Sequence, residues 1–78
     1  MKIDGKTLKY IRCSAGDTMK EMVKKTGYSL STLEKVEYGT RNLSKNATIR
    51  VMKVYSISVD DLRAINATVG ELVRAGLL

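Results

Sequence analysis

The segment from Thr18 to Tyr38 constrains the fold of this chain most, because it predicts two short helices joined by a tight turn. Thr18 and Glu21 have the spacing of a capping box, in which the hydroxyl and the carboxylate each bind an unpaired backbone N–H at a helix start. Gly27 stands where a helix ends in a left-handed residue. The helix between them carries an apolar stripe of helical period, made of Met19, Met22, Val23 and Thr26.

The second half of this segment repeats the same signals. Ser29 is expected to cap a helix over residues 29–38, and Gly39 is expected to end it. Leu33 and Val36 are its predicted buried positions. Two helices around a glycine-containing turn are typical of the helix-turn-helix, but they also occur in ordinary αα-hairpins. Spacing alone therefore leaves both interpretations open.

The composition favours one small, all-α domain. The chain has 78 residues, contains no proline, phenylalanine or tryptophan, and shows no apolar alternation of period two. A domain of this size buries only about 60% of its unfolded surface, so a partner subunit would add stability. We expect residues 1–65 to form the domain and residues 66–78 to form an apolar C-terminal tail that packs on its own domain or on a second copy.

Further helices are predicted on both sides of this segment. The first covers about Gly5 to Ala15 after the cap Asp4, with inward positions Leu8, Ile11 and Ala15. The fourth begins after Ser44 or Asn46 and ends near Tyr55, with an inward stripe of Thr48, Val51, Met52 and Tyr55.

The fifth predicted helix begins after the cap Ser58. Its expected inward positions are Ile57, Val59, Leu62 and Ile65. Thr68 and Glu71 form a second capping-box pattern, which predicts a separate short C-terminal helix rather than one continuous helix.

Several classes of function are disfavoured by the residues that are missing. The chain has no histidine, no paired carboxylate site and no glycine-rich phosphate loop, so we expect a binding protein and not an enzyme. No set of residues matches a zinc site, and no cofactor or small-molecule ligand is indicated. The single cysteine, Cys13, is expected to be a partly buried apolar filler. Neither a signal peptide nor a membrane span is predicted, which favours a cytoplasmic location.

The positive charge is concentrated in the first two thirds of the chain. The net charge is +6 overall, and residues 1–53 hold twelve Lys and Arg against five Asp and Glu. Residues 54–78 hold two basic residues against three acidic ones. A basic part beside a nearly neutral part suits a polyanion partner and a separate contact surface, although a basic face can also serve solubility alone.

Further motifs extend this segment into a family pattern. These are KKTG before the turn, S-x-S-T-L and E-x-G in the second helix, an R-N loop and S-V-D-D-L. In combination, residues from about Thr7 to Leu62 resemble the five-helix DNA-binding domain of lambda repressor, Cro and XRE-type regulators. The resemblance implies that Arg12 pairs with Glu37. The chain departs from the family at Met19, where a phosphate-contacting glutamine is usual, so that only its backbone N–H remains for that contact.

Helix 29–38 is the predicted recognition helix. Its outward positions would meet base edges in the major groove, which admits one α-helix. The expected base contacts are Leu30, Ser31, Glu34 and Lys35. The expected phosphate contacts lie on its flanks and are Thr18, Met19, Ser29, Thr40, Arg41, Asn42 and Lys45.

These features predict a Cro-like or repressor-like transcriptional regulator of phage or mobile-element type. Its partner would be an operator in double-stranded DNA, and a protein of this kind, bacterial or phage, would be associated with the nucleoid. A homodimer would bind two half-sites about 34 Å apart. Two alternatives remain open. One is an antitoxin that represses its own operon, and the other is a protein-interaction module that has lost DNA binding.

Overall fold

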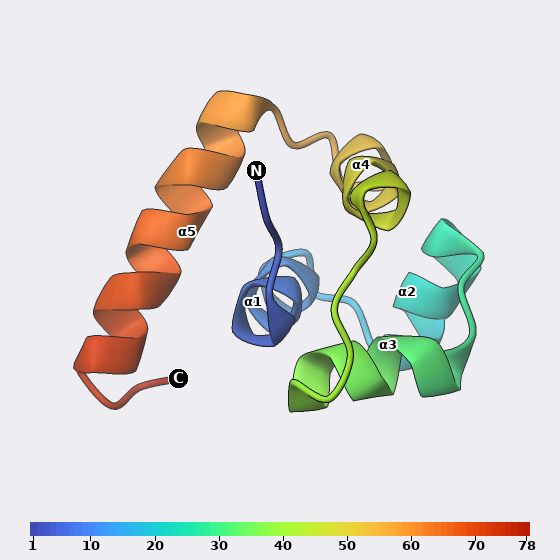
Figure 1. Cartoon of the computed structure of the whole chain (residues 1–78), viewed down its shortest axis with the longest axis horizontal. Coiled ribbons are helices and arrows are strands. Elements are labelled where there is room, and N and C mark those ends of the chain that lie inside the picture. The colour runs from blue at the N-terminus through green and yellow to red at the C-terminus, as the bar shows by residue number, and fades with distance from the viewer.

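The computed structural model describes residues 1–78 and contains five α-helices and no strand. The helices are α1 (Gly5–Ser14), α2 (Met19–Thr26), α3 (Leu30–Tyr38), α4 (Lys45–Val54) and α5 (Val59–Arg74). The predicted all-α class is confirmed. In Figure 1, α1 lies in the middle, with α5 on one side and α2 and α3 on the other. None of the five helices combines the length and apolar character needed to cross a bilayer.

Local sequence signals explain where the helices begin and end. Every helix has an N-cap whose side chain accepts a hydrogen bond from the backbone N–H three residues later. These caps are Asp4, Thr18, Ser29, Ser44 and Ser58. Gly27 and Gly39 end α2 and α3 with φ of 78° and 84°, in the left-handed region that favours glycine. The two short helices around a tight turn are therefore present as predicted.

The hydrophobic core draws on all five helices. Each contributes at least one almost fully buried side chain, and Ile3 adds a further one from the N-terminal segment. The core side chains from the helices include Leu8, Met22, Leu33, Val51 and Leu62. Truncating one of these to alanine is expected to cost about 2–5 kcal/mol. Leu33 and Val36 lie in this core, which fixes the inner face of α3.

The first turn of α1 touches the end of α3 at Gly5. A Cβ atom on Gly5 would overlap the carbonyl oxygen of Val36, and it would lie 2.9 Å from the carbonyl oxygen of Glu37. Both neighbours are backbone atoms, which cannot swing aside as a side chain would. The missing side chain at Gly5 therefore allows the close approach of α1 and α3.

The predicted short C-terminal helix starting at Thr68 is wrong, because α5 runs unbroken from Val59 to Arg74. The local capping pattern is overridden by tertiary contacts. Asn66 accepts a hydrogen bond from Thr7 and donates one to the Lys2 carbonyl, which docks this part of α5 onto α1 and the N-terminal segment. Val69 is buried and continues the inward face of Leu62 across the predicted break.

Three other predicted positions are exposed. Val59 is half exposed because it is the first residue of α5, outside the contact with α1. Ala15 follows the last residue of α1 and also lies outside the core. Cys13 is exposed, because Leu8 and Ile11 define the inward face of α1 and Cys13 is on the opposite side at helical spacing.

Candidate functional site

The outer face of α3 is uncovered. Ser31, Glu34 and Lys35 are exposed, and Leu30 keeps 40% of its surface accessible. On the opposite side of the same helix, Leu33 and Val36 are buried. We refer to Leu30, Ser31, Glu34 and Lys35 as the outer face of α3. No element of the chain covers this face, so it is accessible to a partner molecule.

The start of α3 is held by Ser29. Its hydroxyl accepts a hydrogen bond from the Thr32 N–H at 3.1 Å and donates one to the Thr32 hydroxyl at 2.8 Å. Arg50 of α4 supports the turn before it, because its guanidinium donates to the Thr26 carbonyl at 3.0 Å and stacks 5.2 Å from the ring centre of Tyr28. Arg50 therefore ties the turn between α2 and α3 to α4.

The start of α2 presents unpaired backbone donors. Thr18 and Glu21 form the predicted capping box. The Thr18 N–H donates to the Glu21 carboxylate at 2.9 Å, and the Glu21 N–H donates to the Thr18 hydroxyl at 3.2 Å. The N–H groups of Met19 and Lys20 have no acceptor within the chain. A helix start with two open N–H groups attracts an anion, since the helix dipole is positive there.

An ion pair joins α1 to the end of α3. Arg12 donates to both carboxylate oxygens of Glu37, at 2.9 and 3.1 Å, and to the Asp17 carbonyl at 3.1 Å. The hydrogen bond to Glu37 raises the pKa of Arg12 above its usual value. The contact between Arg12 and Glu37 that the family resemblance implies is thus present. It links the end of α3 to α1.

A second polar cluster holds the loop between α1 and α2. The buried carboxylate of Asp17 accepts hydrogen bonds from the Lys25 ammonium at 2.7 Å and the Tyr55 hydroxyl at 2.9 Å. These bonds, first that of Lys25, lower the pKa of Asp17. Burial and the bond to Asp17 raise the pKa of Tyr55. Sequence reasoning missed this cluster because its members come from three different parts of the chain.

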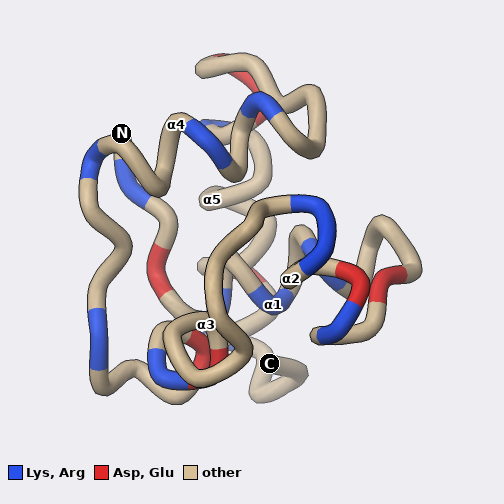
Figure 2. The backbone as a smooth tube through the Cα atoms, turned by 90° about the vertical axis from the view of Figure 1, so that its right-hand side faces the viewer, with Lys and Arg blue, Asp and Glu red and all other residues tan.

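The loop after α3 carries the remaining predicted contacts. Thr40, Arg41, Asn42 and Lys45 are all exposed. Thr40 is tied to the end of α3, since its N–H and its hydroxyl both donate to the Lys35 carbonyl, at 3.0 and 3.1 Å. Arg41 forms no salt bridge and is available to a partner. Figure 2 shows Lys and Arg segments along α4, near α2 and near α3.

Two residues beside the outer face were missed by the sequence analysis. Tyr38 is 85% exposed, and it lies on that face seven residues after Ser31, a spacing that the sequence displays. Lys9 of α1 lines a shallow cleft of about 300 Å³ together with Tyr38, Glu34 and Met19. The cleft thus connects the open start of α2 to the outer face of α3.

No family model matches this chain, and no curated protein and no solved structure matches it. The functional assignment therefore rests on the chain's own residues. The structure also contains no group of three or more His, Cys, Asp or Glu side chains placed to hold a metal ion.

Proposed function

We propose that this chain is a sequence-specific regulator that binds double-stranded DNA through a lambda-repressor-like helix-turn-helix formed by α2 and α3. The single observation that carries the proposal is the outer face of α3. Its polar side chains are uncovered while Leu33 and Val36 anchor the same helix in the core. A helix held in this way fits the major groove, which is about 12 Å wide and admits one helix.

The side chains of the outer face suit base recognition. Lys35 can donate to the O6 and N7 atoms of guanine, and Glu34 can accept from the N4 amino group of cytosine. Ser31 can donate or accept, and Leu30 can contact the methyl group of thymine. The outer face of α3 therefore supplies the side chains needed to recognise the bases of a short half-site.

Phosphate contacts would come from both flanks of α3. The open N–H groups of Met19 and Lys20 suit one phosphate on the α2 side. Thr18 and Ser29 border that side, and Thr40, Arg41, Asn42 and Lys45 border the other. Such contacts set position and much of the affinity, whereas they carry no sequence information.

A homodimer on DNA follows from the small size of one reading helix. Two copies related by a two-fold axis would bind half-sites one helical turn apart, about 34 Å. The candidate contact surface is the C-terminal part of the chain, where Val73 and Leu77 are exposed apolar side chains. This assignment takes residues 1–65 as the DNA-binding part and residues 66–78 as the contact tail.

Selection of bound sites from random duplex DNA tests this proposal. We expect a short, two-fold symmetric motif, with affinity that falls steeply between about 50 and 200 mM salt because several phosphates are neutralised. Recovery of unrelated sequences with no shared motif would contradict sequence-specific binding. The spacing of the half-sites would also report the symmetry of the bound dimer.

A protein-interaction module is the second candidate. Leu30 at 40% exposure and Tyr38 at 85% exposure give the outer face of α3 an apolar share that a partner protein would also bury. The salt titration separates the two functions, since an apolar protein interface responds little to salt and a phosphate-binding interface responds strongly.

A further inference from the structure

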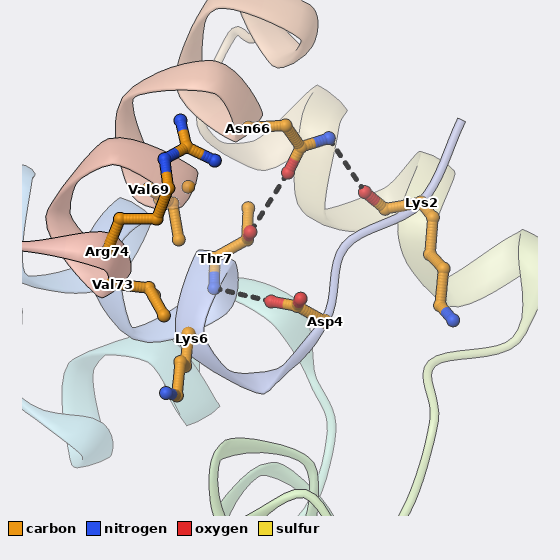
Figure 3. A pocket seen from close by; sticks show the side chains of 9 residues that line it. Lys2, Asp4, Lys6, Thr7, Asn66, Val69, Val73 and Arg74 are labelled. Carbon is orange, nitrogen blue, oxygen red and sulfur yellow. Dashed lines mark hydrogen bonds between the residues drawn. The ribbon is translucent and has the colours of Figure 1, made fainter.

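One carboxylate of the chain has no partner. The chain has eight Asp and Glu residues, and the side chain of each one except Glu34 accepts a hydrogen bond or forms a salt bridge within the chain. Asp4, for example, accepts from the Thr7 N–H at 2.8 Å at the start of α1 (Figure 3). The partnered carboxylates are those of Asp4, Asp17, Glu21, Glu37, Asp60, Asp61 and Glu71. The Glu34 carboxylate is therefore free to accept hydrogen bonds from another molecule.

Glu34 lies in the middle of the outer face of α3. It is exposed, and Leu30 and Tyr38 lie about one helical turn before and after it, at the i−4 and i+4 positions. Glu34 also lines the shallow cleft that contains Lys9 and Met19. Lys9 does not neutralise it, since no salt bridge joins these two side chains. A partner that covers the outer face must therefore accommodate a negative charge near its centre.

A negative charge at this place opposes binding to a polyanion. The phosphates of a duplex repel the carboxylate, and the carboxylate also loses water when it enters a groove. The largely apolar side chains of Leu30 and Tyr38, which are 40% and 85% exposed, would keep water away from it on both sides once the face is covered. A carboxylate that loses its water and gains no donor is strongly disfavoured. Glu34 should therefore weaken binding to every duplex that offers it no hydrogen-bond donor.

The donors that a duplex presents in its major groove are few. An ionised carboxylate only accepts hydrogen bonds. Guanine presents two acceptors in the major groove and thymine presents one acceptor and a methyl group, whereas cytosine and adenine each present an exocyclic amino group. Cytosine is the better match, because the N7 acceptor of adenine lies beside the adenine amino group and would repel the carboxylate. The chemistry that fits Glu34 is thus an exocyclic amino group, foremost the N4 group of cytosine.

We propose that Glu34 is the residue that makes the outer face of α3 selective, and that it acts mainly by rejection. It tolerates an exocyclic amino group at the base edge that it meets, and it excludes duplexes that place an acceptor there. Discrimination by disfavouring the wrong partner is a general route to specificity. This proposal rests on the proposed DNA-binding function. It adds that removal of Glu34 strengthens binding to the wrong duplexes, whereas removal of an ordinary contact would weaken binding.

Binding of Glu34→Ala to single base-pair variants of the selected site tests the proposal. The unchanged chain is expected to lose about tenfold in affinity when the base at one position is replaced by guanine or thymine, as one mismatched base pair does. Glu34→Ala should bind that altered duplex about tenfold more tightly than the unchanged chain does, and its preference at this position should disappear. Its melting temperature should hardly change, because the carboxylate has no partner in the folded chain.

Removal of the amino group from the DNA identifies the base. The probes are the selected duplex with 2-pyrimidinone in place of cytosine, or with purine in place of adenine, at the position found with Glu34→Ala. One of the two should weaken binding of the unchanged chain about tenfold and leave Glu34→Ala unaffected. Loss with 2-pyrimidinone assigns the contact to cytosine, and loss with purine assigns it to adenine. Equal losses for both proteins would contradict a hydrogen bond between Glu34 and an amino group.

Asp60→Ala is the matched control. Asp60 is also an exposed carboxylate, but it lies in the first turn of α5, outside the outer face of α3. Its removal changes the net charge by the same amount as the removal of Glu34, so it should raise the affinity for all duplexes slightly and equally. The same loss of base preference in Asp60→Ala would mean that net charge, and not the position of Glu34, sets the selectivity.

The outcomes separate this proposal from the one on which it rests. Selective binding that Glu34→Ala retains at every base pair would overturn the role of Glu34 and leave the DNA-binding function standing. A uniform loss of affinity in Glu34→Ala would also overturn it, because Glu34 would then be an ordinary contact. Absence of selective binding by the unchanged chain would instead remove the proposed function, and the role of Glu34 with it.

Discussion

Arg12 binds Glu37 through two hydrogen bonds, and this pair connects the end of α1 to the end of α3 across 25 residues of sequence. The side chains are only 16% and 10% exposed, so each charge depends on the other for compensation. Arg12 also donates to the backbone carbonyl of Asp17. One guanidinium therefore connects the loop before α2 with the last turn of α3.

Breaking this pair is expected to destabilise the fold. Arg12→Ala or Glu37→Ala should each lower the free energy of unfolding by about 2 kcal/mol, because each leaves a partly buried charge without its partner. The double variant should lose less than the sum of the two single losses. Urea denaturation measures all three. Arg63→Ala is the control, since its exposed pair with Asp60 should contribute little.

The outer face and its flank are expected to differ in how they affect DNA binding. If the proposed function holds, Lys35→Ala should cost about 1–3 kcal/mol at the selected site and relax preference at one base position. Arg41→Ala should weaken all duplexes about equally and reduce the salt dependence. Fluorescence anisotropy on the selected site and on a scrambled duplex measures both. A uniform loss in both variants would show that Lys35 does not contact a base.

Tyr38 is expected to add affinity at the end of α3. Its exposed ring lies beside the cleft that contains Lys9 and Met19, where a DNA backbone would pass under the proposed function. Tyr38→Ala should weaken binding about tenfold, and Tyr38→Phe should lie between it and the unchanged chain if the hydroxyl donates to phosphate. The free energy of unfolding should hardly change in either variant, because the Tyr38 ring is exposed and not packed in the core. Unchanged DNA affinity in Tyr38→Ala would exclude this contact.

The buried carboxylate of Asp17 gives stability a predictable pH dependence. Its pKa is lowered by the hydrogen bonds from Lys25 and then Tyr55, below the value of about 3.9 that an aspartate has in an unfolded chain. Its contribution to stability is therefore present above about pH 4 and is lost as the pH falls through the lowered pKa. Asp17→Asn should be less stable than the unchanged chain at about pH 7, and the difference should shrink toward about pH 2.

Melting temperatures of both proteins across this pH range provide the measurement for Asp17. The carboxylate of Asp61, whose pKa is lowered by its hydrogen bonds with Ser58, titrates in both proteins and cancels in the difference. A stability difference that stayed constant with pH would show that the charge of Asp17 is not what stabilises the loop.

Ser56 offers a simple way to stabilise the domain. It has φ of 53°, the only non-glycine residue in the left-handed region, in the turn between α4 and α5. Ser56→Gly should raise the free energy of unfolding by about 0.5–1 kcal/mol, since glycine removes the steric cost but gains freedom when unfolded. Ser56→Ala should give no such gain, because alanine keeps the Cβ atom. Thermal denaturation distinguishes the two.

Features encoded within a few residues were predictable from the sequence. The caps Asp4, Thr18 and Ser58 and the glycine end of α2 depend on backbone groups three or four positions away, so their patterns identify them directly. The exposed outer face of α3 followed from helical spacing opposite Leu33 and Val36 for the same reason.

Features that join distant segments were not predictable in this way. Thr68 and Glu71 carry a local capping pattern, but α5 continues through them and is docked by the hydrogen bond of Asn66 with Thr7, 59 residues away. The Asp17 cluster likewise needs Tyr55, 38 residues later.

The contact at Gly5 sets how closely α1 and α3 pack. A methyl group there would act as a wedge between α1 and the carbonyl oxygens of Val36 and Glu37, and would tilt α3 relative to the rest of the domain. Because Gly5 does not belong to the outer face of α3, such a wedge would change the orientation of that face without altering any of its side chains. Position 5 thus sets the orientation of the outer face of α3 from a point outside that face.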